Sequence, residues 1–228
     1  MRVFEVGGSI RDRLILGVSG NDFDFCVEAE SLEALIQSLE SDGVVILHKF
    51  PERLTVKAQM PMKTVKDFVL CRTDEVYENN RLVHCRPGTL YQDMMRRDFT
   101  VNAIARDVHT EEVFDFFGGL ADCENRVLRT VGDPVAKLSE DPRRILRGFR
   151  FMVQCGLTPD PGLASVLFDE SVIGVLRDPL FKDFSVKEIN KAFKLDPVGT
   201  MKAFSMLPVL ASVLFDGHLN LLANSKAK

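Results

Sequence analysis

Two aspartates separated by one residue give the clearest chemical signal in this chain. Asp22 and Asp24 lie in Gly-Asn-Asp-Phe-Asp-Phe, shortly after a Gly-Gly turn. Alternate residues of a β-strand share a face, so both carboxylates would lie side by side. Without a cation they would repel, whereas Mg²⁺ bound by carboxylates and substrate phosphates removes the conflict. A solvated strand edge is the alternative, but the flanking aromatic residues favour an ordered site for phosphate chemistry.

A third carboxylate, Asp67, lies in the strand-like segment 65–72 and could join the first two. Two metal ions bridged by such carboxylates can activate an attacking hydroxyl and stabilise a leaving pyrophosphate. For Asp67 alone, an ordinary surface charge on a strand is an equally good interpretation.

The turn Gly7-Gly8, followed by a short helix with Arg11, could hold a phosphate. Glycine lets the backbone approach a phosphate closely, and the helix that follows points free N–H groups at it. Taken alone, such a turn is more often only structural. The nearby aspartates reverse that preference.

The segment 96–103 begins with Arg96 and Arg97, and Asp98 follows as a carboxylate that could orient one of them. Arginines supply bidentate donors to a triphosphate and neutralise developing charge. The alternative is the capped start of a helix with solvated charges.

Asp141 and Arg144 lie three residues apart in a helix that has Pro142 in its first turn, so they share a face. Cytosine and adenine each present an amino donor beside a ring-nitrogen acceptor, and a carboxylate with a guanidinium complements both. Uracil and guanine present the reverse pattern. The pair would therefore select C and A, unless it is only a surface ion pair.

Hydrophobic periodicity predicts the elements that must position these groups. In the helix after Gly8, Ser9 is expected to be the N-cap with Asp12 as its capping-box partner, and Gly17 ends the helix. From Met94 onward the pattern is mostly helical. The expected strands are 3–6, 22–28, 44–48, 53–59 and 64–71, and the expected helices include 31–39 and short ones within 186–222.

Composition describes an ordinary globular protein. The chain has 228 residues, 46% hydrophobic and 27% charged, with a net charge of −4, so RNA binding would depend on local basic patches. Five scattered cysteines without a Cys-x-x-Cys pair argue against a disulfide framework or a zinc site and fit a reducing compartment. The longest apolar stretch, 203–215, contains Pro208 and is too short to span a bilayer. We therefore expect a cytoplasmic protein without a membrane partner.

In order and spacing, these segments resemble the class II nucleotidyltransferases, the family of CCA-adding tRNA nucleotidyltransferases and bacterial poly(A) polymerases. The resemblance covers roughly residues 3–156. The segment 7–12 with Asp22 and Asp24 is similar to the first family motif, and 96–103 to the second, which contacts the incoming nucleotide. Residues 115–122 resemble the hinge motif, and 140–144 the Glu-Asp-x-x-Arg motif whose Asp and Arg serve as template for C and A.

The resemblance implies a polymerase-beta-like α/β head with a mixed sheet, followed by an all-α neck and a short helical C-terminal region. The expected divisions are 1–118 for the catalytic head, 119–160 for the neck with its nucleotide-selecting helix, and 161–228 for the remainder.

The resemblance also implies transfer of CMP and AMP from CTP and ATP to the 3′ end of tRNA with Mg²⁺ as cofactor. The residues that it marks as catalytic are Asp22, Asp24 and Asp67, the first two as metal ligands. The residues that it marks as nucleotide-binding are Gly7, Gly8, Arg11, Arg96, Arg97, Asp98, Asn102, Asp141, Arg144 and Arg147.

Two departures from the family pattern keep alternatives open. Only about 70 residues follow the template helix, fewer than the body and tail domains of the family need, so a homodimer or a partner protein could supply the grip on RNA. The segment 78–87 also lacks the basic-x-basic-x-Glu element of bacterial CCA-adding enzymes. An enzyme that adds only CC or only A, a short poly(A) polymerase, and a non-catalytic binding remnant are the alternatives.

Overall fold

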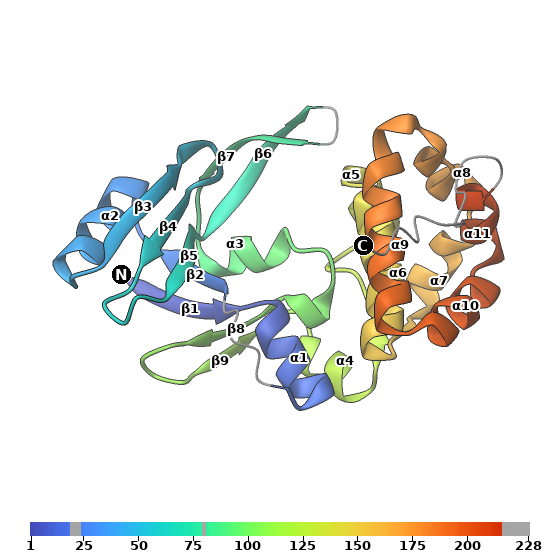
Figure 1. Cartoon of the computed structure of the whole chain (residues 1–228), viewed down its shortest axis with the longest axis horizontal. Helices are drawn as coiled ribbons and strands as arrows, with labels where there is room; N and C mark the ends of the chain where they lie inside the picture. The colour runs from blue at the N-terminus through green and yellow to red at the C-terminus, as the bar shows by residue number, and fades with distance from the viewer. Residues whose placement is uncertain (19–23, 79–80, 216–228) are drawn as a thin grey trace, which may run out of the picture. The chain divides into compact units, whose positions relative to one another are not determined.

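The computed structural model describes residues 1–18, 24–78 and 81–215 (Figure 1). The chain divides into two compact units, Met1–Asn125 and Arg126–Lys228. The first unit contains a mixed sheet with helices, and the second is mainly helical, as expected from the sequence.

The first unit is built on a seven-stranded sheet with the order β3-β4-β5-β2-β1-β8-β9. All its neighbouring strands are antiparallel except β2 and β5, which are parallel. Its strands are β1 (Arg2–Val6), β2 (Asp24–Glu28), β3 (Val45–Phe50), β4 (Thr55–Gln59), β5 (Val65–Leu70), β8 (Ile104–Asp107) and β9 (Val113–Asp115). A separate hairpin joins β6 (Arg72–Glu78) and β7 (Arg81–Pro87).

Short helices connect and cover these strands. The helices of the first unit are α1 (Gly8–Leu16), α2 (Leu32–Ser41), α3 (Leu90–Met95) and α4 (Gly119–Glu124), with 3₁₀ turns η1 (Pro51–Arg53) and η2 (Thr100–Asn102). The Thr89 side chain and Gln92 form a reciprocal capping box at the start of α3.

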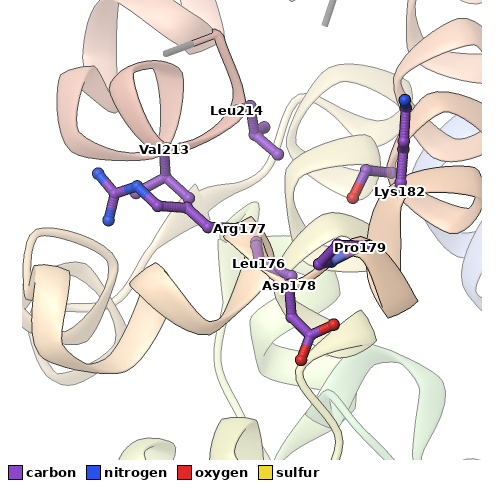
Figure 2. A pocket seen from close by; sticks show the side chains of 8 residues that line it. Leu176, Arg177, Asp178, Pro179, Lys182, Val213 and Leu214 are labelled. Carbon is purple, nitrogen blue, oxygen red and sulfur yellow. The ribbon is translucent and has the colours of Figure 1, made fainter. Parts of the chain in front are cut away.

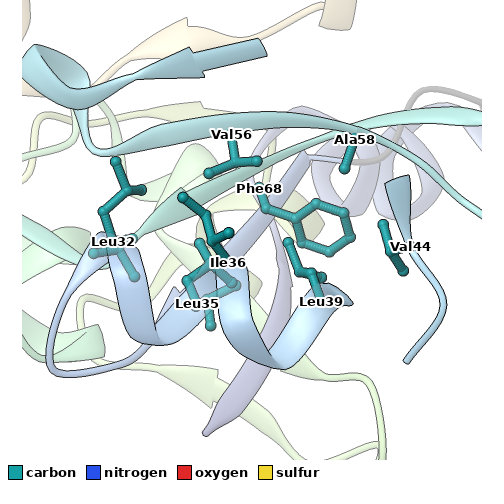
Figure 3. Packing of buried hydrophobic residues seen from close by; sticks show 10 residues of the cluster. Leu32, Leu35, Ile36, Leu39, Val44, Val56, Ala58 and Phe68 are labelled. Atoms are coloured by element: carbon teal, nitrogen blue, oxygen red, sulfur yellow. The ribbon is translucent and has the colours of Figure 1, made fainter. Parts of the chain in front are cut away.

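The hydrophobic core of the sheet lies under α2 (Figure 3). Ser31 caps this helix by accepting a hydrogen bond from the Ala34 amide, and the apolar stripe of the helix then faces the strands. Leu35 is fully buried there and packs in one cluster with Val27 and Phe68.

The start of α1 differs from the expected one. Gly7, at φ 77°, makes the turn, and its carbonyl accepts the Arg11 amide at 3.1 Å. The helix therefore begins at Gly8, and the prediction of Ser9 as N-cap with Asp12 as its partner is wrong. Ser9 lies inside the first turn because a left-handed glycine, rather than a side-chain cap, reverses the chain. Gly17, at φ 68°, ends the helix as expected.

Two strands of the seven-stranded sheet, β8 and β9, lie in the region that the sequence pattern predicts as mostly helical. β8 and β9 form a hairpin that pairs with β1 at one side of the sheet. Their few residues are too short for a clear period-two pattern, and pairing with β1 decides their conformation.

In the second unit, helices pack around α6, whose buried side carries Ile145, Phe149 and Met152 at helical spacing. The Phe149 and Phe204 rings lie 4.3 Å apart between centroids. The elements are β10 (Val127–Leu128) parallel to β11 (Thr158–Pro159), α5 (Pro134–Glu140), α6 (Arg143–Cys155), α7 (Pro161–Leu167), α8 (Glu170–Ile173), η3 (Gly174–Arg177), η4 (Pro179–Phe181), α9 (Lys182–Leu195), α10 (Pro197–Met206) and α11 (Pro208–Phe215).

Within the described ranges, no single helix has both the length and the hydropathy of a membrane span. Only α10 and α11 taken together reach that hydropathy, and they are bent by 106°.

The burial of Leu35 predicts a large cost for its truncation. Leu35→Ala should lower the free energy of unfolding by about 2–5 kcal/mol, because it removes buried methyl groups and leaves a cavity. Leu14→Ala is the matched control, since Leu14 is also helical but 49% exposed, and should change stability by no more than about 0.5 kcal/mol. Urea denaturation measures both, and equal losses would contradict the assigned core.

Candidate nucleotide and metal site

The parallel pairing of β2 and β5 brings two of the three predicted carboxylates to neighbouring positions. Phe25 is paired with Phe68 in parallel register, so the preceding residues, Asp24 and Asp67, are also neighbours across the two strands. The Phe25 and Phe68 rings stack at 5.4 Å and lie at the core under α2. Since side chains alternate along a strand, Asp24 and Asp67 lie on the opposite face of the sheet.

These positions suit a divalent cation by their chemistry. Asp24 is exposed, and the carboxylate of Asp67 is about half exposed, with the Lys57 ammonium 3.8 Å from its Oδ1. Oxygen ligands from carboxylates are those that Mg²⁺ prefers. Asp22, the third member of the predicted set, lies outside the described residues. In the part of the chain that the structure describes, no group of three or more His, Cys, Asp or Glu side chains could hold a metal ion.

The Gly-Gly turn lies close to Asp24, because Asp24 pairs with Val6, the residue before Gly7. Arg11, one turn into α1, is almost completely buried. Its Nη1 donates to Asn102 Oδ1 at 2.6 Å, and its Nε donates to Asp12 Oδ1 at 2.9 Å. The first predicted motif is thus tied to the second through Asn102.

The second motif folds around a carboxylate. Asp98 Oδ1 accepts hydrogen bonds from the Phe99 amide at 2.8 Å and from Asn102 Nδ2 at 3.0 Å, which holds Asn102 in place. Arg97 Nη1 donates to the Asn102 carbonyl at 3.1 Å. A β-carbon added to Gly7 would lie only 2.8 Å from Arg97 Nη1, so the turn comes close to the guanidinium, and the φ of 77° at Gly7 favours glycine there.

Asp93 is a site residue that the sequence reasoning missed. Its side chain is fully buried, and it forms ion pairs with Arg96 at 2.8 Å and Arg97 at 3.1 Å. Burial opposes ionisation of this carboxyl, but the two arginines together hold its pKa below the usual 3.8. The spacing of three and four residues to Arg96 and Arg97 is a signal that could have identified it.

Sulfur atoms also meet behind this site. Cys26, on the same face of β2 as Asp24, lies with its Sγ 2.9 Å from Cys71 Sγ, and both are free thiols. Burial raises the pKa of Cys26, the Cys71 thiol and the Asp93 carboxylate raise it further, and Arg97 lowers it. The helix α3, which carries Asp93 and leads into the arginine segment, packs against β2, the strand of Asp24 and Cys26.

The predicted hinge motif, residues 115–122, contacts the arginine segment, residues 96–103. Thr100 Oγ1 donates to Asp122 Oδ2 at 2.7 Å, and the Gly119 amide donates to Asp115 Oδ1 at 2.7 Å. A β-carbon on Gly119 would lie 2.2 Å from the Thr100 carbonyl oxygen. The loop that carries Asn102 therefore rests against α4 at a distance that only glycine allows.

In the second unit, only one of the two candidate template residues lies in α6. Arg144 is in its first turn, whereas Asp141 has extended backbone between α5 and α6, so it lies outside the helix in which the sequence pattern places it. Asp141 accepts hydrogen bonds from the Arg143 amide at 3.1 Å and from Arg143 Nε at 2.7 Å. Arg144 is buried and donates to Glu140 and to the Lys137 carbonyl, the latter at 2.9 Å. The guanidinium of Arg147 lies 5.8 Å from the centre of the Phe151 ring.

A pocket in the second unit is formed by other residues (Figure 2). Its lining comes from η3, η4, α9 and α11: Leu176, Arg177, Asp178, Pro179, Lys182, Ser185, Val213 and Leu214. This lining contains none of the residues that the sequence analysis selects.

Comparison with known proteins decides the family. Residues 3–129 match the model of the poly A polymerase head domain. The chain belongs to this nucleotidyltransferase family. The matched range contains the two glycines, the aspartates and the arginine segment, so the family resemblance seen in the sequence is confirmed.

Several relatives are tRNA-processing enzymes. The chain is 33% identical to the A-adding tRNA nucleotidyltransferase of Aquifex aeolicus over 78% of its own length and 21% of the relative. It is 32% identical to the CCA-adding enzyme of Staphylococcus epidermidis over 92% of its length and 52% of the relative. A solved tRNA nucleotidyltransferase, complexed with a primer tRNA and an incoming ATP analog, superposes with a TM-score of 0.76 at 30% identity, covering 95% of this chain and 60% of that one. The chain thus spans about half or less of the length of these curated relatives.

The close approach at Gly119 predicts a stability effect. Gly119→Ala should lower the free energy of unfolding by about 1–3 kcal/mol or more, because the new methyl group meets a backbone carbonyl that cannot move aside cheaply. Gly162→Ala is the control, since Gly162 also lies in the first turn of a helix but a β-carbon there meets its nearest atom at 3.6 Å. The control should stabilise by about 0.4–1 kcal/mol. Calorimetric unfolding of both variants checks the opposite signs.

Proposed function

We propose that this protein is a tRNA nucleotidyltransferase that adds CMP and AMP from CTP and ATP to the tRNA 3′ end. One observation carries the proposal: the Gly7 turn, Arg11, Asn102 and Arg97 form one hydrogen-bonded group beside the strand that begins at Asp24. This group offers cations and backbone N–H groups to a triphosphate next to carboxylates that suit a divalent metal.

The reaction requires little covalent chemistry from the protein. The 3′ hydroxyl oxygen of the RNA attacks the α-phosphorus, the bond to the β-phosphate oxygen breaks, and pyrophosphate leaves while the hydroxyl proton passes to solvent. Asp22 and Asp24, helped by Asp67, would hold Mg²⁺, which supplies charge neutralisation and a more acidic hydroxyl when bound. Arg11, Arg96 and Arg97 would orient the triphosphate, and Gly7-Gly8 would let it approach the backbone.

Base selection is assigned to the second unit. Asp141, just before α6, offers an acceptor and Arg144, in its first turn, offers donors, in the pattern that complements C and A. Their bonds to Arg143 and Glu140 limit the orientations that each side chain can adopt. We infer that a bound base forms hydrogen bonds with side chains that are already held in place before the nucleotide binds.

The acceptor is proposed from the names of the relatives. The solved structure with a primer tRNA supports tRNA rather than another RNA. A second copy or a partner protein that adds to the grip on RNA stays a prediction. A cytoplasmic location stays a prediction.

A narrower activity is the second candidate. The 33% identity to an A-adding enzyme favours addition of A alone over addition by a poly(A) polymerase. The composition of the added tail distinguishes A, CC and CCA addition, and a long run of A would identify a poly(A) polymerase.

The carboxylates should be essential to turnover. Purified protein with Mg²⁺, CTP, ATP and a tRNA lacking its terminal CCA should extend the RNA, as sequencing of the 3′ ends would show. Asp24→Asn and Asp22→Ala should lower the rate about 100-fold or more with every nucleotide, because a metal ligand is lost. Glu40→Gln, an exposed carboxylate on α2, is the control and should keep full activity. If the unmodified chain extends no tRNA even at high enzyme concentration, the proposed function is wrong.

Arg144 should control which nucleotide is added. Arg144→Ala should reduce discrimination between correct and incorrect bases by about 10-fold to 100-fold, since one bidentate pairing is worth about 1–3 kcal/mol, while transfer itself continues. Competition between the four nucleotides, read by sequencing of the products, measures this change. Arg177→Ala, an exposed arginine of the same unit, should leave selection unchanged. Equal loss with all nucleotides and no misincorporation would contradict the template role.

A further inference from the structure

We propose that Asp93 is a positioning residue for nucleotide binding: it fixes Arg96 and Arg97 together against the Gly7 turn so that both guanidiniums meet the triphosphate in a set orientation. The inference rests on the proposed function, because it concerns the same site. Asp93 would act through the arginines and would not touch the reacting atoms.

The carboxylate of Asp93 divides its two oxygens between the two arginines. Oδ1 accepts from Arg96 Nε at 2.9 Å, and Oδ2 accepts from Arg97 Nη2 at 3.1 Å and from Nε at 3.4 Å. Two adjacent guanidiniums would repel each other, and one shared carboxylate removes much of that repulsion. The two cations can therefore remain close before any phosphate arrives.

Asp93 also connects the arginines to the strand that carries a candidate metal ligand. Its Oδ1 accepts the backbone N–H of Arg72 at 3.4 Å, and Arg72 begins β6 just after the end of β5, the strand of Asp67. The helix α3 packs against β6 and β2. Asp93 and its helix α3 thus connect the arginine segment to β2 and to the chain that follows β5, the two strands that carry Asp24 and Asp67.

On its other side, Arg97 reaches the phosphate-binding turn. Its Nη1 bonds the Asn102 carbonyl at 3.1 Å and lies where a β-carbon on Gly7 would come within 2.8 Å. Asp93 holds Nε and Nη2 of the same guanidinium, so the planar group is fixed from two directions. Loss of one anchor would let it rotate away from the turn.

Asp93 stays ionised at neutral pH because its two arginine partners outweigh the effect of its burial. A fully buried carboxylate without partners would be driven to protonation, yet the arginines hold its pKa below 3.8. It is therefore ionised throughout the pH range in which a nucleotide triphosphate carries its full charge. Counted together, Asp93, Arg96 and Arg97 keep one net positive charge beside the turn, as an anion site requires.

The test measures equilibrium binding of Mg²⁺ complexes of CTP, ATP and inorganic triphosphate by calorimetry, together with KM and kcat for extension. Asp93→Asn keeps the shape but removes the charge that holds both arginines. It should weaken binding of all three ligands about 10-fold to 100-fold and equally, because the arginines contact phosphate and not base. KM should rise by the same factor, with a smaller change in kcat. Asp93→Glu, which restores the charge, should recover part of the affinity.

Glu5→Gln is the matched control. Glu5 is a buried carboxylate of the same unit that also binds two arginines, Arg13 and Arg106, but its side chain lies on the opposite face of the sheet from Asp24. It should lower the melting temperature as Asp93→Asn does, yet leave triphosphate affinity unchanged.

The outcomes separate the two proposals. Unchanged affinity in Asp93→Asn, or a matching loss in Glu5→Gln, would overturn the positioning role, and so would failure of both Asp93 variants to fold while Glu5→Gln folds. Triphosphate binding that depends on Asp93 in a chain that extends no tRNA would uphold this inference and reject the proposed function. Absence of triphosphate binding by the unmodified chain would reject both.

Discussion

The site depends on one pairing in the sheet, the parallel ladder between β2 and β5. In this parallel pair, Asp24 lies beside Asp67, and the next residues, Phe25 and Phe68, lie beside each other. The two phenylalanine rings stack on the core side of the sheet. The antiparallel partner on the other side, β1, ends at Val6 opposite Asp24 and leads straight into the Gly-Gly turn. The carboxylates and the Gly-Gly turn are therefore neighbours because of sheet register, and the α2 core fixes that register through the opposite face.

Such a site brings charges of the same sign close together, and they repel each other. The arginines and the carboxylates differ in how this repulsion is reduced. The charges of the arginines are compensated inside the protein, by Asp93 for Arg96 and Arg97 and by Asp12 for Arg11, which also donates a hydrogen bond to Asn102. The carboxylates Asp24 and Asp67 are left at the exposed face, where Lys57 is the partner that approaches Asp67. Buried charges need partners within the fold, whereas exposed carboxylates can exchange a weak partner for a cation.

The sequence predicted much of this because the chemistry lies in short segments with strong local signals. The Gly-Gly turn, the helix that starts with Ser31 and the buried stripe of α6 follow from local spacing. Asp93 was missed because a lone aspartate before two arginines looks like a surface charge until its burial is known. The β8–β9 hairpin was missed because four-residue and three-residue strands are decided by their pairing with β1. Ser9 was misassigned since a left-handed glycine can start a helix without a side-chain cap.

A chain with a net charge of −4 must bind polyanions through local fields. In the proposed site, paired arginines and exposed carboxylates both lie near the Gly-Gly turn, so a triphosphate would be attracted most strongly as its metal complex. Free triphosphate would meet the exposed Asp24 and Asp67 and be repelled, and free metal would find few ligands among the described residues. Metal and nucleotide should therefore bind cooperatively, each supplying the charge that the other needs. In this proposed binding mode, Asp93 would hold the arginines in place before the triphosphate binds. An arginine that became ordered only on binding would lose part of the binding free energy to conformational entropy.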